Sequence, residues 1–62
     1  MKVTEIRVFD VNGKLILNIK DETLLLETKE GFINVSYVSE YSEHKRHVLI
    51  PSTNISQVLY WE

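Results

Sequence analysis

Apolar and polar residues alternate along most of this chain with the two-residue period of β-strands. In residues 14–20, Leu15, Leu17 and Ile19 fall on one side of an extended backbone, and most of the polar residues fall on the other. Residues 32–38 alternate in the same way, and residues 3–10 are rich in β-branched side chains. The pattern predicts six strands, at residues 3–10, 14–20, 23–29, 32–38, 46–50 and 55–61.

A helix competes with a strand only around the three successive leucines at 24–26. Leucine favours helices, but a run of three cannot form the 3.6-residue apolar stripe of an amphipathic helix. The segment is also short, and Glu30-Gly31 follows it as a turn signal. We therefore predict a strand here as well.

The connections between the predicted strands are short. Asn12-Gly13 is a strong hairpin signal because both residues can adopt positive φ, and Gly31 is the expected positive-φ residue of a second tight turn. Asp21 and Glu22 belong to a third, polar connection. Short connections favour pairing of consecutive strands, so the first four strands are expected to form an antiparallel meander.

Several strands carry apolar residues on both faces, which a single sheet with one wet face would not need. We therefore expect the sheet to curl, to be covered by a second subunit, or both. The predicted fold class is all-β, a small antiparallel barrel or strongly curled meander of five or six strands in a single domain spanning residues 1–62. The candidate interface residues are Ile16, Leu25, Phe32, Tyr60 and Trp61.

The segment between the last two strands contains the only proline, Pro51, which fixes φ and lacks an N–H donor. The side chains of residues 52–54 can bond nearby backbone, so we expect one 3₁₀ turn before the last strand. This strand–turn–strand segment resembles the closing segment of Sm-like and Src-homology-type small β-barrels. The resemblance implies that Ile50 and Ile55 flank the turn at the core and that edge strands pair between copies. It implies neither family's ligand, because the peptide groove and the RNA-pocket motifs of those families are missing.

Length and composition favour self-association. A chain of 62 residues buries only ~60% of its unfolded surface, so small domains commonly need a staple or a partner. The absence of cysteine excludes disulfides and thiolate zinc sites. The hydrophobic content of 44% is that of a folded protein rather than a disordered one.

Charge and hydropathy narrow the classes of partner. A formal charge of −2 disfavours general binding to polyanions, because such binding depends on Lys and Arg neutralising phosphates. No apolar run is long enough to span a membrane, and charged residues interrupt the N-terminal segment where a signal peptide would need an apolar core. We expect a soluble cytoplasmic protein with no membrane partner.

The one cationic cluster lies near the predicted fifth strand. The candidate binding residues are Tyr41, His44, Lys45, Arg46 and His47. They could contact phosphates and stack on bases, or they could form a solvated hairpin tip balanced by nearby glutamates. The two histidines are three residues apart, which places them on opposite faces of a strand, and no third ligand is specified. We predict no metal site and no cofactor.

No arrangement of residues typical of catalysis is present, neither a glycine-rich phosphate loop nor a nucleophile elbow nor a pair of buried carboxylates. An active or small-molecule site assembled between subunits stays open. The predicted function is a non-catalytic binding or interaction protein that acts as a homo-oligomer, an accessory or regulatory factor of the kind that bacteria and phages encode. Its partners would be copies of itself and another protein. The alternative is binding of RNA or single-stranded nucleic acid through a loop at residues 41–47.

Overall fold

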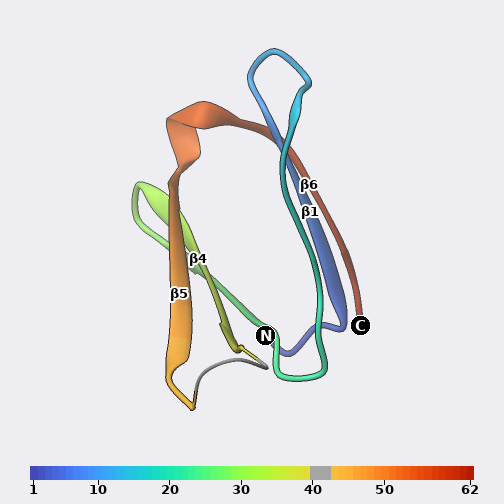
Figure 1. Ribbon diagram of the computed structural model, residues 1–62. Coiled ribbons are helices and arrows are strands. Elements are labelled where there is room, and N and C mark those ends of the chain that lie inside the picture. The colour runs from blue at the N-terminus through green and yellow to red at the C-terminus, as the bar shows by residue number, and fades with distance from the viewer. Residues whose placement is uncertain (40–42) are drawn as a thin grey trace.

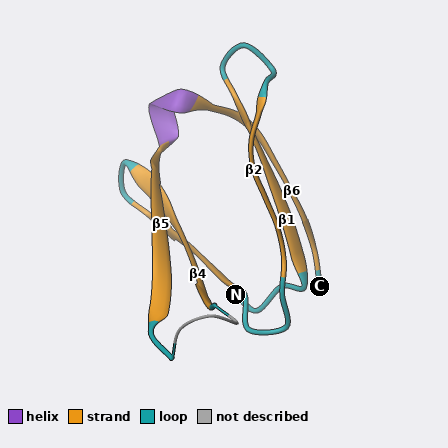
Figure 2. Ribbon diagram, in the orientation of Figure 1, coloured by secondary structure: helices purple, strands orange, loops and turns teal. Residues whose placement is uncertain are grey.

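Two antiparallel three-stranded sheets face each other in the computed structural model, which describes residues 1–39 and 43–62 (Figures 1 and 2). The elements are β1 (Glu5–Asp10), β2 (Leu15–Lys20), β3 (Leu25–Lys29), β4 (Phe32–Val38), β5 (Lys45–Pro51), the 3₁₀ turn η1 (Ser52–Asn54) and β6 (Ile55–Trp61). We name the sheets after their central strands: the β1 sheet has the order β2-β1-β6 and the β4 sheet has the order β3-β4-β5. The fold class is all-β, as the alternation predicts.

The predicted meander of the first four strands is wrong at one point, because β2 and β3 belong to different sheets. The N-terminal residues run beside β3, where the Leu26 amide donates to the Met1 carbonyl at 2.8 Å and the Val3 amide donates to the Leu24 carbonyl at 3.3 Å. The chain then bends at Thr4 into the β1 sheet. Stacking the two sheets buries the inward rows of both, whereas a flat meander would leave one apolar face in water.

The core lies between the two sheets and consists of short aliphatic rows that alternate with outward residues. Its buried residues are Val3, Ile6, Val8, Leu24, Leu26, Ile33, Val35 and Ile50. Ile55 packs against this cluster from the other side of η1, so the two isoleucines flank the 3₁₀ turn at the core. The 3₁₀ turn itself is confirmed, and Pro51 ends β5 immediately before it with φ of −59°.

The two predicted turns at Gly13 and Gly31 are confirmed, and in the Asn12-Gly13 turn only the glycine adopts positive φ. Gly13 and Gly31 adopt φ of +79° and +87°, whereas Asn12 keeps a negative φ. The loop is organised by Asp10, whose Oδ1 accepts hydrogen bonds from the Asn12 and Lys14 amides, each at 2.9 Å. The predicted hairpin is therefore closed by one positive-φ glycine, and the Asp10 side chain organises the rest of the turn.

A β-bulge in β2 reverses the predicted orientation of one residue. Val8 pairs with Leu17, but Phe9 pairs with Leu15, so Ile16 is the extra residue in the ladder. Directly opposed residues share a face, and Leu15 therefore lies with Phe9 on the outside. Leu15 is 43% exposed, whereas Leu17 packs against the core. The predicted common face of Leu15, Leu17 and Ile19 is wrong for Leu15.

The folded chain has a larger accessible surface than is typical of a monomer of its mass. Its accessible surface is 4520 Å², against about 4,200 Å² expected for a monomer of 7.3 kDa. The radius of gyration is 11.3 Å, against about 10.6 Å expected for this length. The hairpin between β1 and β2 extends beyond the sheets and accounts for part of the excess (Figure 1).

Candidate interaction site

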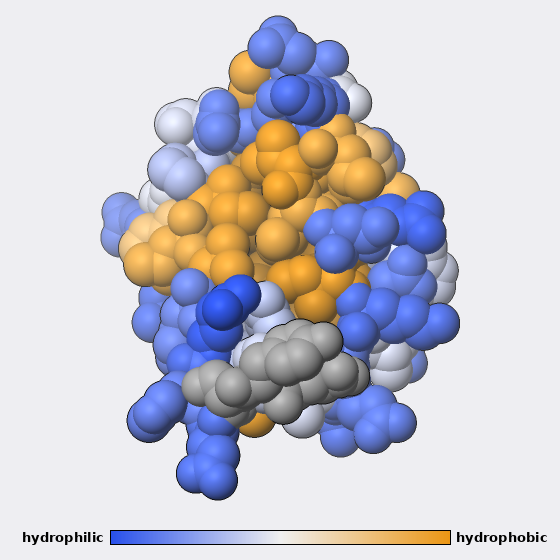
Figure 3. Space-filling model, in the orientation of Figure 1, coloured by the Kyte–Doolittle hydropathy of each residue, from blue (hydrophilic) through white to orange (hydrophobic). Residues whose placement is uncertain are grey.

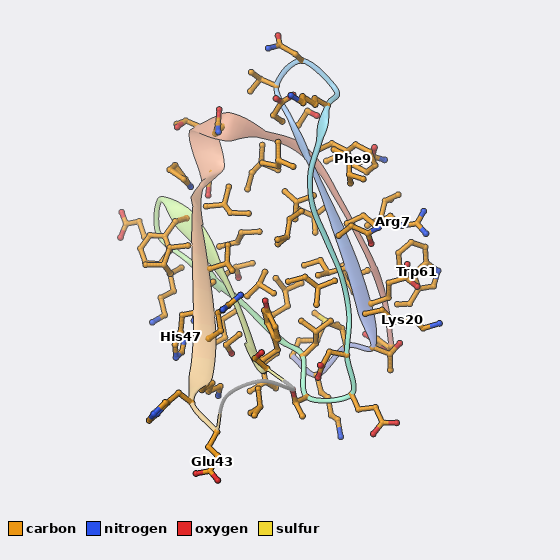
Figure 4. All side chains as sticks on the ribbon, viewed as in Figure 1. Arg7, Phe9, Lys20, Glu43, His47 and Trp61 are labelled. Atoms are coloured by element: carbon orange, nitrogen blue, oxygen red, sulfur yellow. The ribbon has the colours of Figure 1, made fainter. Side chains whose placement is uncertain are left out.

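The outer face of the β1 sheet gathers aromatic, aliphatic and cationic side chains. Because the inward rows contain Ile6 and Val8, the residues that alternate with them point outward. We call this surface the Trp61 face; its residues are Glu5, Arg7, Phe9, Leu15, Asn18, Lys20, Gln57, Leu59 and Trp61. Four of them, labelled in Figure 4, point away from the space between the sheets.

Arg7 lies at the centre of the Trp61 face and has two partners. Its guanidinium carbon lies 5.2 Å from the centroid of the Trp61 ring, and its Nη2 donates to Glu5 Oε2 at 3.1 Å. An exposed cation–π contact contributes ~0.5–1 kcal/mol and an exposed ion pair less than ~1 kcal/mol. Both contacts orient the guanidinium over the ring and leave much of the ring accessible, because Trp61 is 44% exposed.

The backbone of Trp61 is fixed by the bend that joins the two sheets. Its carbonyl accepts hydrogen bonds from the Thr4 amide at 2.7 Å and from Thr4 Oγ1 at 3.2 Å. These bonds fix the backbone from which the Trp61 ring projects, so less of this segment has to be ordered when a partner binds.

The outer face of the β4 sheet is different in character. Asn34 and Ser36 alternate with the core residues of β4, yet both are buried. Among residues 1–39 and 43–62, neither Asn34 Oδ1 nor Ser36 Oγ has a hydrogen-bond partner. Asn34 Nδ2 lies 3.4 Å from His47 Nδ1 of the adjacent strand. Beside them Leu49 is 61% exposed. This side of the β4 sheet therefore combines one exposed aliphatic side chain, Leu49, with two buried polar side chains.

The cationic cluster is divided by the structure. Lys45, Arg46 and His47 belong to β5 rather than to a hairpin tip, because they pair with Val38, Tyr37 and Ser36 of β4. The register places Lys45 and His47 on the outer face and Arg46 in the inward row. His44 precedes the strand and is exposed, and Tyr41 lies outside the described residues. The predicted strand at 46–50 is confirmed and begins one residue earlier, so the predicted binding loop at 41–47 does not extend over residues 45–47. The strand separates the cations.

The five candidate interface residues do not form one patch. Leu25 and Phe32 lie half-buried on the outer face of the β4 sheet, and Ile16 lies at the bulge of β2. Trp61 lies on the Trp61 face, as described above. Tyr60 pairs with Ile6 in the inward row, yet it reaches the surface.

Tyr60 borders a hollow of about 430 Å³ where β6 passes β3. Met1, Leu26, Ile33 and Val58 contribute to its walls. The hollow is open to solvent rather than enclosed, so we assign no ligand to it.

On the side of the molecule opposite to this hollow, the edge strands β2 and β5 face each other across the two sheets without pairing. Each of these strands pairs on one side only within the described part of the chain. Leu17, Ile19 and Val48 on their inward rows are only partly buried. Figure 3, viewed as Figure 1, shows the resulting apolar area between the two strands.

The Asp21 carboxylate forms hydrogen bonds with a residue close to it in the sequence. Asp21 Oδ1 accepts hydrogen bonds from Thr23 Oγ1 at 2.5 Å and from the Thr23 amide at 2.7 Å, and these bonds lower the pKa of the Asp21 carboxyl below its usual value.

Residues 1–39 and 43–62 contain no group of three or more His, Asp or Glu side chains that could hold a metal ion. They also contain no helix long and apolar enough to cross a membrane.

Sequence reasoning missed Arg7, Phe9 and Leu59 as members of a surface. A signal was available, because Arg7 and Phe9 occupy the face opposite Ile6 and Val8 of the same strand. The meeting of Arg7 with Trp61 could not be found in this way, because it depends on which strand becomes the neighbour of β1. The alternation of apolar and polar residues along the sequence gave no indication that Asn34 and Ser36 would be buried.

Comparison of the chain with protein-family models, with curated proteins and with solved structures found no significant match.

Proposed function

We propose that this chain is a non-catalytic interaction protein that associates with copies of itself and presents the Trp61 face to a further protein. The observation that carries the self-association is the apolar area between β2 and β5, where the two sheets leave Leu17, Ile19 and Val48 partly uncovered. Covering such an area with a second chain removes apolar surface from water at ~25 cal/mol per Å². A domain of this size gains more from that burial than a large one.

The composition of the Trp61 face supports a protein partner. Tryptophan and arginine are enriched among the residues that dominate binding energy at interfaces. Here both are held in place, Arg7 by Glu5 and the Trp61 backbone by Thr4. The likeness to Sm-like and Src-homology-type barrels stays a prediction.

The native mass of the purified chain tests the proposal. Light scattering coupled to size exclusion, at concentrations from about 1 µM to 1 mM, is expected to give a multiple of 7.3 kDa at the upper end. A mass of one chain throughout this range would contradict the self-association. Proteins that copurify with the wild type but not with a Trp61→Ala variant would identify the further partner.

A second candidate is binding of single-stranded nucleic acid, and one observation favours it on a different surface from the predicted loop. Phe9 and Trp61 offer aromatic rings on the same outer face as Arg7 and Lys20 (Figure 4). Bases stack on such rings and phosphates pair with such cations. Glu5 and the net charge of −2 oppose it. Fluorescence anisotropy with a labelled oligonucleotide tests it, since salt-dependent binding lost in Trp61→Ala but kept in Lys45→Ala supports this surface.

A further inference from the structure

The free edge of β2 differs from the other three edges of the two sheets. The edge of β3 is occupied by Met1 and Val3 through backbone hydrogen bonds. The β5 edge strand carries Lys45 and Arg46 and ends in a proline, and such residues protect an edge from pairing. The β6 strand also carries neither charge nor proline, but its edge lies beside the hollow, at the opposite end of the β1 sheet from the apolar area between β2 and β5. Between Leu15 and Ile19, β2 carries neither charge nor proline.

The hydrogen-bond phase of the β1–β2 ladder shows which groups point to this edge. The Asp21 amide donates to the Thr4 carbonyl at 3.1 Å, one step beyond the pair of Glu5 with Lys20. Hydrogen-bonded and non-hydrogen-bonded pairs alternate along an antiparallel ladder. The pair of Glu5 with Lys20 is therefore non-hydrogen-bonded, and so is the pair of Arg7 with Asn18. The backbone N–H and C=O groups of Asn18 and Lys20 consequently point away from β1, toward the free edge.

The geometry points to a second copy of this chain as the occupant of that edge, bound by antiparallel pairing of β2 with the β2 strand of the partner. A two-fold axis at Asn18 places Asn18 opposite the partner's Asn18, so that the outward N–H and C=O groups of the two residues satisfy one another. Leu17 then lies opposite the partner's Ile19 on the inward side, and the reverse pair repeats the contact. This inference rests on the proposed self-association and assigns the surface that performs it.

The bulge at Ile16 limits how far this pairing can extend toward Lys14. Residues 17–20 lie on the regular side of the bulge, where the β1–β2 ladder has no irregularity. An axis at Asn18 pairs Leu17 with the partner's Ile19 within that regular stretch and opposes no two like charges there.

The pairing also covers the apolar area of Figure 3, which β2 borders, because the partner's β2 extends the β1 sheet past β2. The result is one six-stranded sheet of order β6-β1-β2-β2-β1-β6. The axis is perpendicular to the sheet, so both Trp61 faces lie on the same side and form one continuous surface. A partner protein would then meet two copies of Arg7 and Trp61.

Proline at position 18 tests the edge directly. Because the Asn18 amide points away from β1, Asn18→Pro removes a donor from the proposed pair without removing a bond of the β1 ladder. We expect this variant to have the mass of one chain at concentrations where the unaltered chain is a dimer. Asn18→Thr keeps the amide and the strand propensity, and it is the matched control that stays dimeric. Circular dichroism and melting show whether each variant is folded.

Charge at position 18 tests the register and does not depend on the proline variant folding. Asn18 is exposed, so its substitution leaves the core intact. Asn18→Lys places two like charges opposite each other across the axis, and we expect it to raise the dimer dissociation constant about tenfold; Asn18→Asp should do the same. An equimolar mixture of the two variants restores dimerisation, because each opposed pair then joins a lysine with an aspartate. If neither variant weakens the dimer, the axis does not lie at Asn18 and this register is overturned.

Amide hydrogen exchange distinguishes the failure of this inference from the failure of the proposed function. The Asn18 and Lys20 amides are expected to be protected at high concentration and to exchange faster on dilution, whereas the Leu17 and Ile19 amides stay protected throughout. If the dimer keeps its mass in Asn18→Pro and in Asn18→Lys, the β2 pairing is overturned, and the chain associates through another surface. A chain that is monomeric at 1 mM overturns both.

Discussion

The guanidinium of Arg7 lies 5.2 Å from the centre of the Trp61 ring, and it joins the first strand of the fold to the last one. The contact forms on the outside of the β1 sheet, where register places Arg7 beside Leu59 and Glu5 beside Trp61. It is a diagonal neighbour contact across two strands, and it covers one part of an exposed aromatic ring with a cation.

Replacing Arg7 by alanine is expected to lower the free energy of unfolding by ~0.5–1.5 kcal/mol, because the cation–π contact and the exposed ion pair with Glu5 are both lost. Urea denaturation followed by the fluorescence of Trp61, the only tryptophan, measures the change. Glu5→Gln is the control, because it removes the ion pair and leaves Arg7 over the ring. Equal losses in the two variants would mean that the stacking contributes nothing.

Leu24 and Leu25 are neighbours in sequence but lie in opposite environments. Alanine substitutions at the two positions should therefore lower the free energy of unfolding by different amounts. Leu24 is fully buried between the sheets, so Leu24→Ala is expected to cost ~2–5 kcal/mol by removing burial and leaving a cavity. Leu25 is half-buried on the outer face, and Leu25→Ala should cost ~1 kcal/mol or less. Thermal unfolding of both variants measures the difference, and similar losses would contradict the assigned faces.

Ser36 carries a buried hydroxyl that has no hydrogen-bond partner in the described part of the chain, so its removal should be harmless. We expect Ser36→Ala to leave the free energy of unfolding unchanged or to raise it by ~1 kcal/mol, since an unsatisfied buried polar group is destabilising. Ser36→Thr, which keeps the hydroxyl and adds a methyl group in a closed space, is the contrast. A loss of more than ~1 kcal/mol in Ser36→Ala would show that the hydroxyl has a bonding partner in solution.

The Asp21 carboxylate makes stability depend on pH in a definite direction. Hydrogen bonds from Thr23 hold the folded-state pKa of Asp21 below the value of 3.8 that applies to the unfolded chain. The carboxylate therefore contributes stability above pH 3.8, and that contribution is lost as pH falls through the lower folded-state pKa. We expect Asp21→Asn to be less stable than the wild type at neutral pH and to converge with it in acid. Glu22→Gln is the control, and an unchanged difference across the acid range would contradict the assignment.

Local patterns in the sequence determined where most of the extended segments lie. Strands β4 and β6 occupy the predicted residues, and η1 follows Pro51 as expected. These features depend on side-chain alternation and on backbone restrictions of proline and glycine, which act within a few residues. The inward placement of Ile33 and Val35 follows from the same alternation.

Only the tertiary structure decided which strands pair and which surfaces result. The separation of β2 from β3 depends on the bend at Thr4, and the outward position of Leu15 depends on a bulge that one extra residue introduces. The meeting of Arg7 with Trp61 and the division of the cations along β5 follow from those pairings. Alternation specifies the two sides of a strand but not its neighbours, because neighbours are chosen by the burial of whole inward rows between sheets.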